Sequence, residues 1–172
     1  GSSLTGLSAV PDNYLTGMIL SNDSDSDHDI SIKVGITKNS TNASDLELTS
    51  AIVKQIDATW ANGSAAGGLA SGVTLSANTW YHLHAIAVTA GTDAGFDTSS
   101  VAANLIANND ASAYRRIGSV FTDSSSNIIP FSQIGDEFLW NTNSSALVIS
   151  KNNITVDTTF AVTIATPLSV TT

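Results

Sequence analysis

The chain has 172 residues, a formal net charge of −9 and no cysteine, and only 12% of its residues are charged. Globular domains usually carry about 25% charged residues, so Ser, Thr, Asn, Gly and Ala must supply most of this surface. The six basic residues are too few and too scattered to release phosphate counterions or to hold an anionic bilayer, which argues against nucleic-acid and membrane partners.

The N-terminal part of the chain predicts two strands separated by a polar loop. Residues 14–20 form a mostly apolar run, and the isoleucines and valine of residues 30–36 alternate with other residues. Alternation with period two is typical of a half-buried strand. Residues 22–29, between the two strands, are polar and rich in aspartate, and residues 39–45 form a loop of turn formers.

One short α-helix is predicted over about residues 50–61. Ile52, Ile56 and Trp60 recur at i, i+4 and i+8, which places them on one face of a helix. Residues suited to cap the two ends of a helix flank the segment, namely Thr49, Ser50, Asn62 and Gly63.

The rest of the chain predicts short strands at close spacing. Residues 80–88 give the strongest signal, and because both faces are partly apolar we expect a central strand. Residues 115–121 and 128–134 flank a polar turn, as in a β-hairpin. Residues 95–97 are predicted as a short strand or a turn, and further short strands are predicted at 138–140, 146–150, 154–156 and 160–164.

This pattern predicts a mainly β fold, a β-sandwich or jelly roll with one short helix, built as a single domain over residues 1–172. Gly1-Ser2 is typical of an expression-tag remnant. Residues 167–172 end without a polar tail, so we expect a truncated, cleaved or natural end. A strand left open there would need a partner, for example from another chain.

Four alternating carboxylates make the residues 22–29 loop a candidate calcium site: Asp23, Asp25, Asp27 and Asp29. An EF-hand is excluded, because its sixth and twelfth positions require Gly and Glu and here hold His28 and Val34. The alternative, which we favour, is a solvated turn that leads into a strand.

His82 and His84 share one face of a predicted strand and are a candidate start of a zinc site. The third ligand would have to be His28 or a distant carboxylate, and ordinary polar packing is the preferred alternative. Asp136 and Glu137 are adjacent and point to opposite faces of a strand, so they cannot form a glycosidase pair by themselves.

The large aromatic residues allow two interpretations, sugar stacking or core packing, and we favour the core for Trp60 and Trp80. The set comprises Trp60, Trp80, Tyr81 and Trp140. Arg115 and Arg116 are expected to form ion pairs with Asp136 or Glu137, with a bound anion as the alternative. Because no nucleophile elbow, P-loop or dinucleotide fingerprint is present, we predict no enzyme, no cofactor, and no catalytic or metal-binding residue.

Six segments in a fixed order give the chain a resemblance to a known family. They are residues 14–22, 27–32, 57–63, 78–83, 114–120 and 135–140. In these segments the chain resembles bacteriophage and prophage tail proteins of the tail fibre or tail spike kind. Members of that family continue beyond a segment like residues 167–170, which implies that this chain lacks the last part of the domain or that this part exists as a separate chain.

The resemblance implies a structural virion protein that takes part in tail assembly or host-surface attachment. Its expected partners are other phage tail proteins, copies of itself in a homo-oligomer (a trimer above all) and a host-surface glycan, and its expected location is the phage tail, outside the cell. The alternative functions are a lectin-like carbohydrate-binding module and, less favoured, a glycan-degrading enzyme. The family has no agreed functional residues, so none is carried over.

Overall fold

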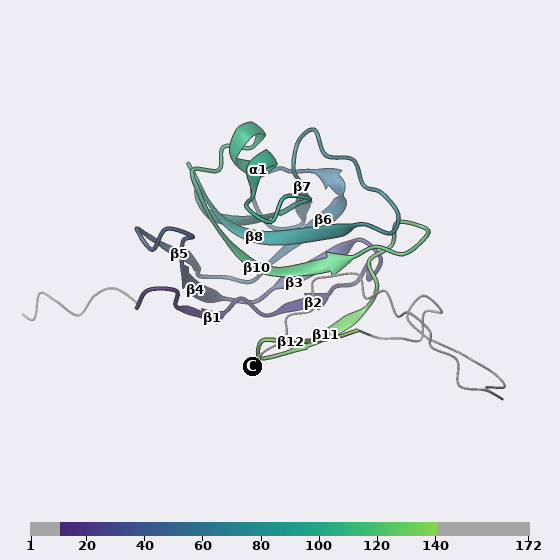
Figure 1. Cartoon of the computed structure of the whole chain (residues 1–172), viewed down its shortest axis with the longest axis horizontal. Coiled ribbons are helices and arrows are strands. Elements are labelled where there is room, and N and C mark those ends of the chain that lie inside the picture. The colour runs from purple at the N-terminus through teal and green to yellow at the C-terminus, as the bar shows by residue number, and fades with distance from the viewer. Residues whose placement is uncertain (1–10, 141–172) are drawn as a thin grey trace, which may run out of the picture.

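The computed structural model describes residues 11–140, which form the mainly β fold of Figure 1. The strands β1 to β6 span Leu15–Gly17, Leu20–Asn22, Asp29–Ile32, Gly35–Lys38, Asp45–Leu48 and Ile52–Thr59. The strands β7 to β12 span Ala66–Leu69, Trp80–Val88, Gly91–Asp97, Ala113–Phe121, Phe131–Ile134 and Glu137–Trp140, and the helix α1 spans Ala103–Asn108. The strands predicted at 146–150, 154–156 and 160–164 lie outside the described residues.

The strands form one large and one small sheet. The nine-stranded sheet has the order β10-β8-β9-β7-β6-β3-β2-β11-β12, and the three-stranded sheet has the order β1-β4-β5. All pairings are antiparallel except β6 with β7 and β7 with β9. Strand β8 lies between β10 and β9, which confirms its predicted central position.

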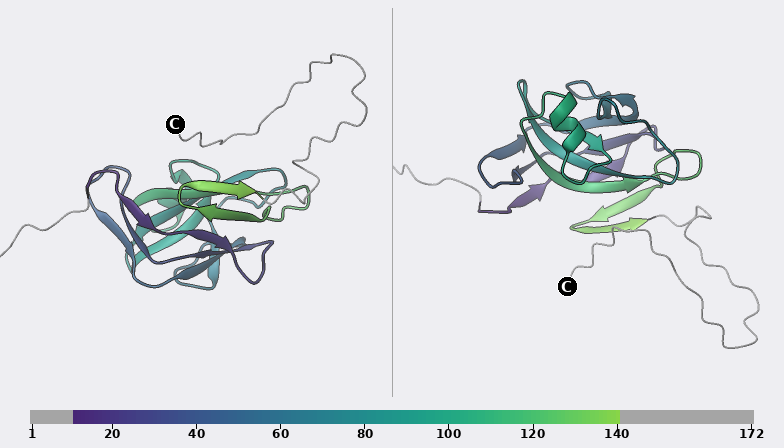
Figure 2. Two further views of the ribbon diagram at one scale, coloured as in Figure 1. Left: turned by 90° about the horizontal axis from the view of Figure 1, so that it is seen from below. Right: turned by 45° about the horizontal axis from the view of Figure 1, so that its top comes forward.

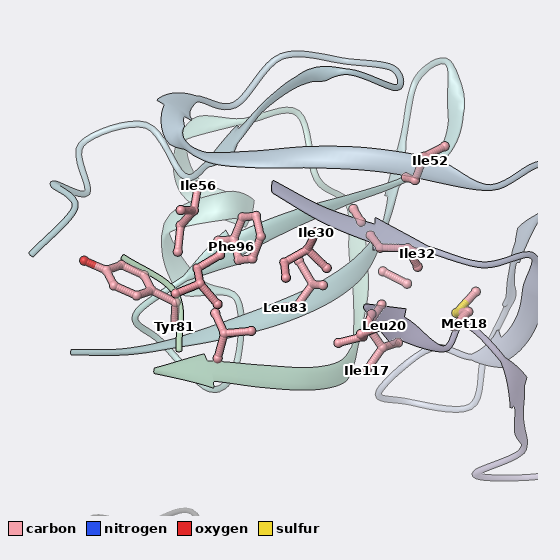
Figure 3. Packing of buried hydrophobic residues seen from close by; sticks show 14 of the residues in the cluster. Met18, Leu20, Ile30, Ile32, Ile52, Ile56, Tyr81, Leu83, Phe96 and Ile117 are labelled. Atoms are coloured by element: carbon pink, nitrogen blue, oxygen red, sulfur yellow. The ribbon is translucent and has the colours of Figure 1, made fainter. Parts of the chain in front are cut away.

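The large sheet encloses the main hydrophobic core between its two halves. Ile30 of β3 and Ile56 of β6 face Tyr81 and Leu83 of β8 and Phe96 of β9 (Figure 3), and all five are fully buried. Two sheet halves that face each other across one core make a β-sandwich-like fold, as predicted. The order of the strands, with the sheet folded over, brings residues from distant parts of the chain into this core.

Two runs that the sequence predicts as single strands are each divided between the two sheets. Residues 14–20 become β1 and β2, and residues 30–36 become β3 and β4. The backbones of these two segments lie very close together where Gly17 is paired with Gly35. A Cβ atom on Gly35 would lie 2.4 Å from the Met18 nitrogen and 2.5 Å from the Thr16 oxygen, so only glycine permits this approach of two backbones.

The prediction of a helix at residues 50–61 is wrong, because most of this segment forms strand β6, Ile52–Thr59. Ile52, Lys54 and Ile56 are buried on one face, while the residues between them are more exposed. A spacing of four fits a strand of period two as well as a helix of period 3.6, so the isoleucines alone could not separate the two. The β-branched residues of the segment favour the strand.

The helix of this fold is α1, which covers the outer face of β8 and β9 (Figure 1). Leu105 of α1 packs with Ile86 of β8 in a second, smaller hydrophobic cluster. Gly95 of β9 makes room for it, since a Cβ atom there would lie 2.7 Å from Leu105 Cδ2. A six-residue helix carries too few periodic positions to be recognised from the sequence.

The predicted hairpin of residues 115–121 with 128–134 forms only at its closed end. Thr122 and Ile128 make an isolated bridge, and the chain then leaves β10 at Pro130. Proline has no backbone N–H for a ladder hydrogen bond. Strand β11 pairs instead with β12 and, at one position, with β2. The β11–β12 hairpin forms the lower margin of the described molecule in Figure 1 and in the right-hand view of Figure 2.

The close backbone approach at Gly35 predicts a large steric cost for Gly35→Ala. We expect the variant to lose about 4 kcal/mol or more of unfolding free energy, because the new methyl group meets rigid backbone atoms. Gly91→Ala is the matched control: Gly91 has φ 129° and open space around its Cα, so its cost is limited to backbone strain of about 1–2 kcal/mol. Urea unfolding followed by circular dichroism measures both. Equal losses would contradict the steric role of Gly35.

Candidate functional site

The aspartate-rich loop between β2 and β3 is a hydrogen-bonded turn. The Asp25 carbonyl accepts hydrogen bonds from the N–H groups of His28, at 3.2 Å, and Asp29, at 2.7 Å. The Asp25 carboxylate lies 3.2 Å from Nδ1 of His28. Burial raises the pKa of Asp29, and the nearby charges of Asp25 and Asp57 raise it further. In this loop the Asp25 carboxylate thus contacts His28, and the negative charge of Asp25 acts unfavourably on the ionised form of Asp29.

No group of three or more His, Cys, Asp or Glu side chains within residues 11–140 is placed to hold a metal ion. The candidate calcium loop therefore forms no ligand set there, and neither do His82 and His84. His28, the suggested third zinc ligand, is held by Asp25 in its own loop. A helix of the length and apolarity needed to cross a bilayer is likewise absent from this part of the chain.

His82 and His84 lie on the outer face of β8 and differ in burial. Nδ1 of His82 is 2.8 Å from Oγ of Ser119 on β10, and this histidine is partly exposed. His84 is fully buried, and its Nε2 lies 3.0 Å from the Ser99 carbonyl. Because a carbonyl can only accept, Nε2 of His84 carries the proton. Nδ1 of His84 is buried with no hydrogen-bond partner among the described residues.

Burial determines the charge of both histidines. It lowers the pKa of His84 from 6.5 to about 4, against the weaker opposing effects of the Ser99 carbonyl and Asp97. Burial also lowers the pKa of His82, and the positive charge of Arg116 lowers it further. Both imidazoles are therefore neutral at pH 7.

The contact between Ser119 and His82 has the two groups that a catalytic nucleophile and its general base would need, a hydroxyl and an imidazole. Nucleophilic catalysis needs a third group that orients the base. Asp97, whose strand position pairs with His82, is committed elsewhere: it accepts hydrogen bonds from the backbone of Ser99, at 2.8 Å, and of Asn104, at 2.8 Å. No catalytic triad is assembled around Ser119.

Asp97 instead fixes the start of α1. Its buried carboxylate also accepts from Leu105 N–H at 3.1 Å and from the Asn104 side chain at 2.7 Å. The helix N-cap residue, Ala102, has no side chain that can accept a hydrogen bond, so a residue on β9 satisfies these N–H groups. No local sequence motif predicts this cap, because the carboxylate and the N–H groups that it accepts from are brought together by the fold.

Five aromatic side chains gather where the β11–β12 hairpin meets β8 and β10. Trp80 lies 4.9 Å from Phe121 and 5.6 Å from Trp140, measured between ring centroids. Trp140 also lies 5.5 Å from Phe131 and 6.3 Å from Phe138. The rings of Trp80 and Trp140 contact other aromatic rings. Trp80 is partly exposed and belongs to neither buried cluster, so it is not the core residue that we expected. Nε1 of Trp80 is buried without a partner among the described residues.

The expected ion pairs of Arg115 and Arg116 with Asp136 or Glu137 do not form in the described structure. Arg115 donates a hydrogen bond to the Asn13 carbonyl at 3.3 Å. The two arginines are on β10, which pairs with β8, whereas Asp136 is in the turn of the β11–β12 hairpin. The expectation was wrong because it assumed that β10 and β11 form one ladder.

A buried pair of charged residues, Lys54 and Asp93, was not recognised from the sequence. Lys54 Nζ lies 3.4 Å from the Asp93 carboxylate, 5.4 Å from the Trp60 ring centroid and 2.7 Å from the Ala61 carbonyl. Nε1 of Trp60 donates to the Ala94 carbonyl at 3.0 Å, so Trp60 packs against the fold as expected. The signal in the sequence was the position of Lys54 midway between Ile52 and Ile56, which places it on the buried face of a strand.

A shallow, open depression of about 460 Å³ lies on the three-stranded sheet. Its lining includes Thr16 of β1, Ile36 of β4 and Glu47 of β5. Binding sites for small molecules are usually enclosed and hold several convergent polar groups. This open surface with one carboxylate is not of that kind.

Comparison of the chain with protein families, with curated proteins and with solved structures gave no match.

The buried His84 predicts a loss of stability in acid. In the unfolded chain this histidine takes up a proton near pH 6.5, but in the folded protein only near pH 4. The unfolded state binds more protons between these values, so the contribution of His84 is complete above pH 6.5 and falls as the pH approaches 4, by about 3 kcal/mol. Unfolding free energies of the wild type and His84→Gln at pH 7 and pH 4 measure it. We expect a smaller loss in the variant; equal losses would contradict this assignment.

Proposed function

We propose that this chain is a structural virion domain of a phage tail fibre or tail spike, which assembles with copies of itself and serves tail assembly or attachment to the host surface. The order of the six resembling segments supports the class of protein. The observation that carries the assembly role is the β11–β12 hairpin at the edge of the large sheet.

Within residues 11–140, the hairpin presents an open strand edge. Strand β12 is the last strand of the nine-stranded sheet and is paired only with β11 among the described residues. An open edge offers backbone N–H and C=O groups to a strand of another chain. Its tight turn, Gly135-Asp136, has φ 61° at Gly135, the positive φ that two-residue loops starting with glycine use.

The outward face of the same hairpin carries two exposed apolar side chains beside Ser132 and Glu137. Ile134 is 64% exposed and Leu139 is 52% exposed. The register pairs Ser132 with Leu139 and Ile134 with Glu137, so the two apolar side chains are diagonal neighbours on one face. An open edge beside exposed apolar side chains supports contact with a further protein chain.

The aromatic cluster favours the assembly role over the alternative of a carbohydrate-binding module. The rings of Trp80 and Trp140 are partly exposed, but they contact each other and the rings of Phe121 and Phe131. The cluster instead anchors the hairpin to the body of the sandwich. Asp136 and Glu137 are adjacent in the sequence, so these two carboxylates do not form the facing pair that glycan cleavage needs.

The proposal predicts that the wild-type chain is an oligomer, with a trimer as the expected state. Ile134→Lys with Leu139→Lys places two positive charges on the outward face of the hairpin, and we expect this double variant to run as a monomer. Both side chains are exposed, so the fold itself should survive, as circular dichroism will check. Size-exclusion chromatography with light scattering measures the mass.

Val101→Lys with Ile106→Lys is the matched control, because these residues are also exposed, at 54% and 45%, but lie near α1. The control should keep the wild-type mass. A monomeric wild type, or a control that dissociates as much as the hairpin variant, would overturn the assembly role. Saturable binding on a glycan array that is lost in Trp140→Ala would support the carbohydrate-binding alternative.

A further inference from the structure

Lys54 and Asp93 bring an amine and a carboxyl group together in the interior of the protein. Lys54 is 0% exposed and Asp93 is 3% exposed. Nζ of Lys54 lies 3.4 Å from Oδ1 and 3.4 Å from Oδ2 of Asp93. The amine therefore faces the carboxyl group as a whole, and does not form a close contact with one oxygen.

The separation is long for an ion pair. Charge-assisted hydrogen bonds between an ammonium group and a carboxylate are usually about 2.7–2.9 Å long. The amine makes its closer hydrogen bonds to two carbonyl oxygens, of Ala61 at 2.7 Å and of Gly63 at 3.1 Å. These two carbonyls hold Nζ in place, and the remaining side of the amine faces Asp93.

The carboxyl group is held by two backbone N–H groups. Oδ2 of Asp93 accepts from Gly63 N–H at 2.8 Å, and Oδ1 accepts from Ala94 N–H at 2.7 Å. Donors in this arrangement polarise a carboxyl carbon and stabilise the negative charge of a tetrahedral intermediate. Both reacting groups are thus fixed before any reaction, which removes much of the entropic barrier.

The surroundings favour the nucleophilic form of the amine. Burial lowers the pKa of Lys54, against the opposing effect of the Asp93 charge. The ring of Trp60 lies 5.4 Å from Nζ and helps to exclude water. A neutral, desolvated amine is a nucleophile, whereas an ammonium group is not.

We propose that Lys54 and Asp93 condense to an intramolecular isopeptide bond that joins β6 to β9. A proton passes from the ammonium group to the carboxylate, and neutral Nζ attacks Cγ of Asp93. The N–Cγ bond forms, one Cγ–O bond breaks, and the hydroxyl leaves with a proton from Nζ as one water molecule. No oxidant, reductant or other reactant is required. The inference is independent of the function proposed above.

The bond would cross-link two strands that are separated in the sheet by β7. A covalent link between distant positions restricts the unfolded chain, as a disulfide does, and this chain has no cysteine. The amide would keep one N–H to donate to the Ala61 or Gly63 carbonyl, so these oxygens need not both lose their partner.

Intact-mass spectrometry of the purified, unfolded wild-type chain tests the proposal. We expect a mass lower by one water than the sequence mass, and a protease digest that contains a branched peptide joining Lys54 to Asp93. Lys54→Met removes the amine and should restore the full sequence mass. The measurement is made on unfolded protein, so a variant that folds poorly still gives a clear answer.

Lys38→Met is the matched control, since Lys38 also faces a carboxylate, that of Asp45 at 2.6 Å, but Asp45 is exposed. This control should keep the loss of one water. A wild-type chain at its full sequence mass would overturn the proposal and leave Lys54 and Asp93 as an ion pair. A loss of water that persists in Lys54→Met would overturn it as well.

Discussion

The close approach of two backbones at Gly17 and Gly35 is the constraint on which the rest of the fold depends. The two segments that pair there each continue from the small sheet into the large one. A side chain at Gly35 would meet backbone atoms of the other segment, and backbone cannot move aside as a flexible side chain can. This close pairing lets β1 and β4 lie in the small sheet while β2 and β3 lie in the large one.

Buried polar groups then attach the loops and the helix to this frame. Asp97 satisfies the first N–H groups of α1, and Lys54 with Asp93 holds the loop of residues 61–63 against β6 and β9. A buried charge is costly unless its hydrogen bonds are complete. Here nearly every such bond is to the backbone of a loop or a helix end, so these charges fix the positions of segments that have little apolar surface of their own.

In the part of the chain that the structure describes, one margin of the large sheet, at β12, has no partner strand, and the proposed assembly role is located there. The inner face of the β11–β12 hairpin is anchored by the aromatic cluster, whereas its outer face carries Ile134 and Leu139. The candidate sites that the sequence suggested, the aspartate loop and the two β8 histidines, are explained by turn formation and by burial. The sequence showed that residues able to bind a metal were present. Whether they come together as a ligand set depends on the residues that the fold places around them.

The sequence by itself determined the β-rich class, the central strand at residues 80–88 and the strand at 138–140, because these depend on local alternation and on turn residues. It did not decide between helix and strand at Ile52 and Ile56, since a spacing of four satisfies both periods. Only the tertiary structure decided that two apolar runs divide at Gly17 and Gly35, that β11 leaves β10, and that Lys54 meets Asp93. The reason is that each of these outcomes is fixed by contacts between residues far apart in the chain, which no local pattern records.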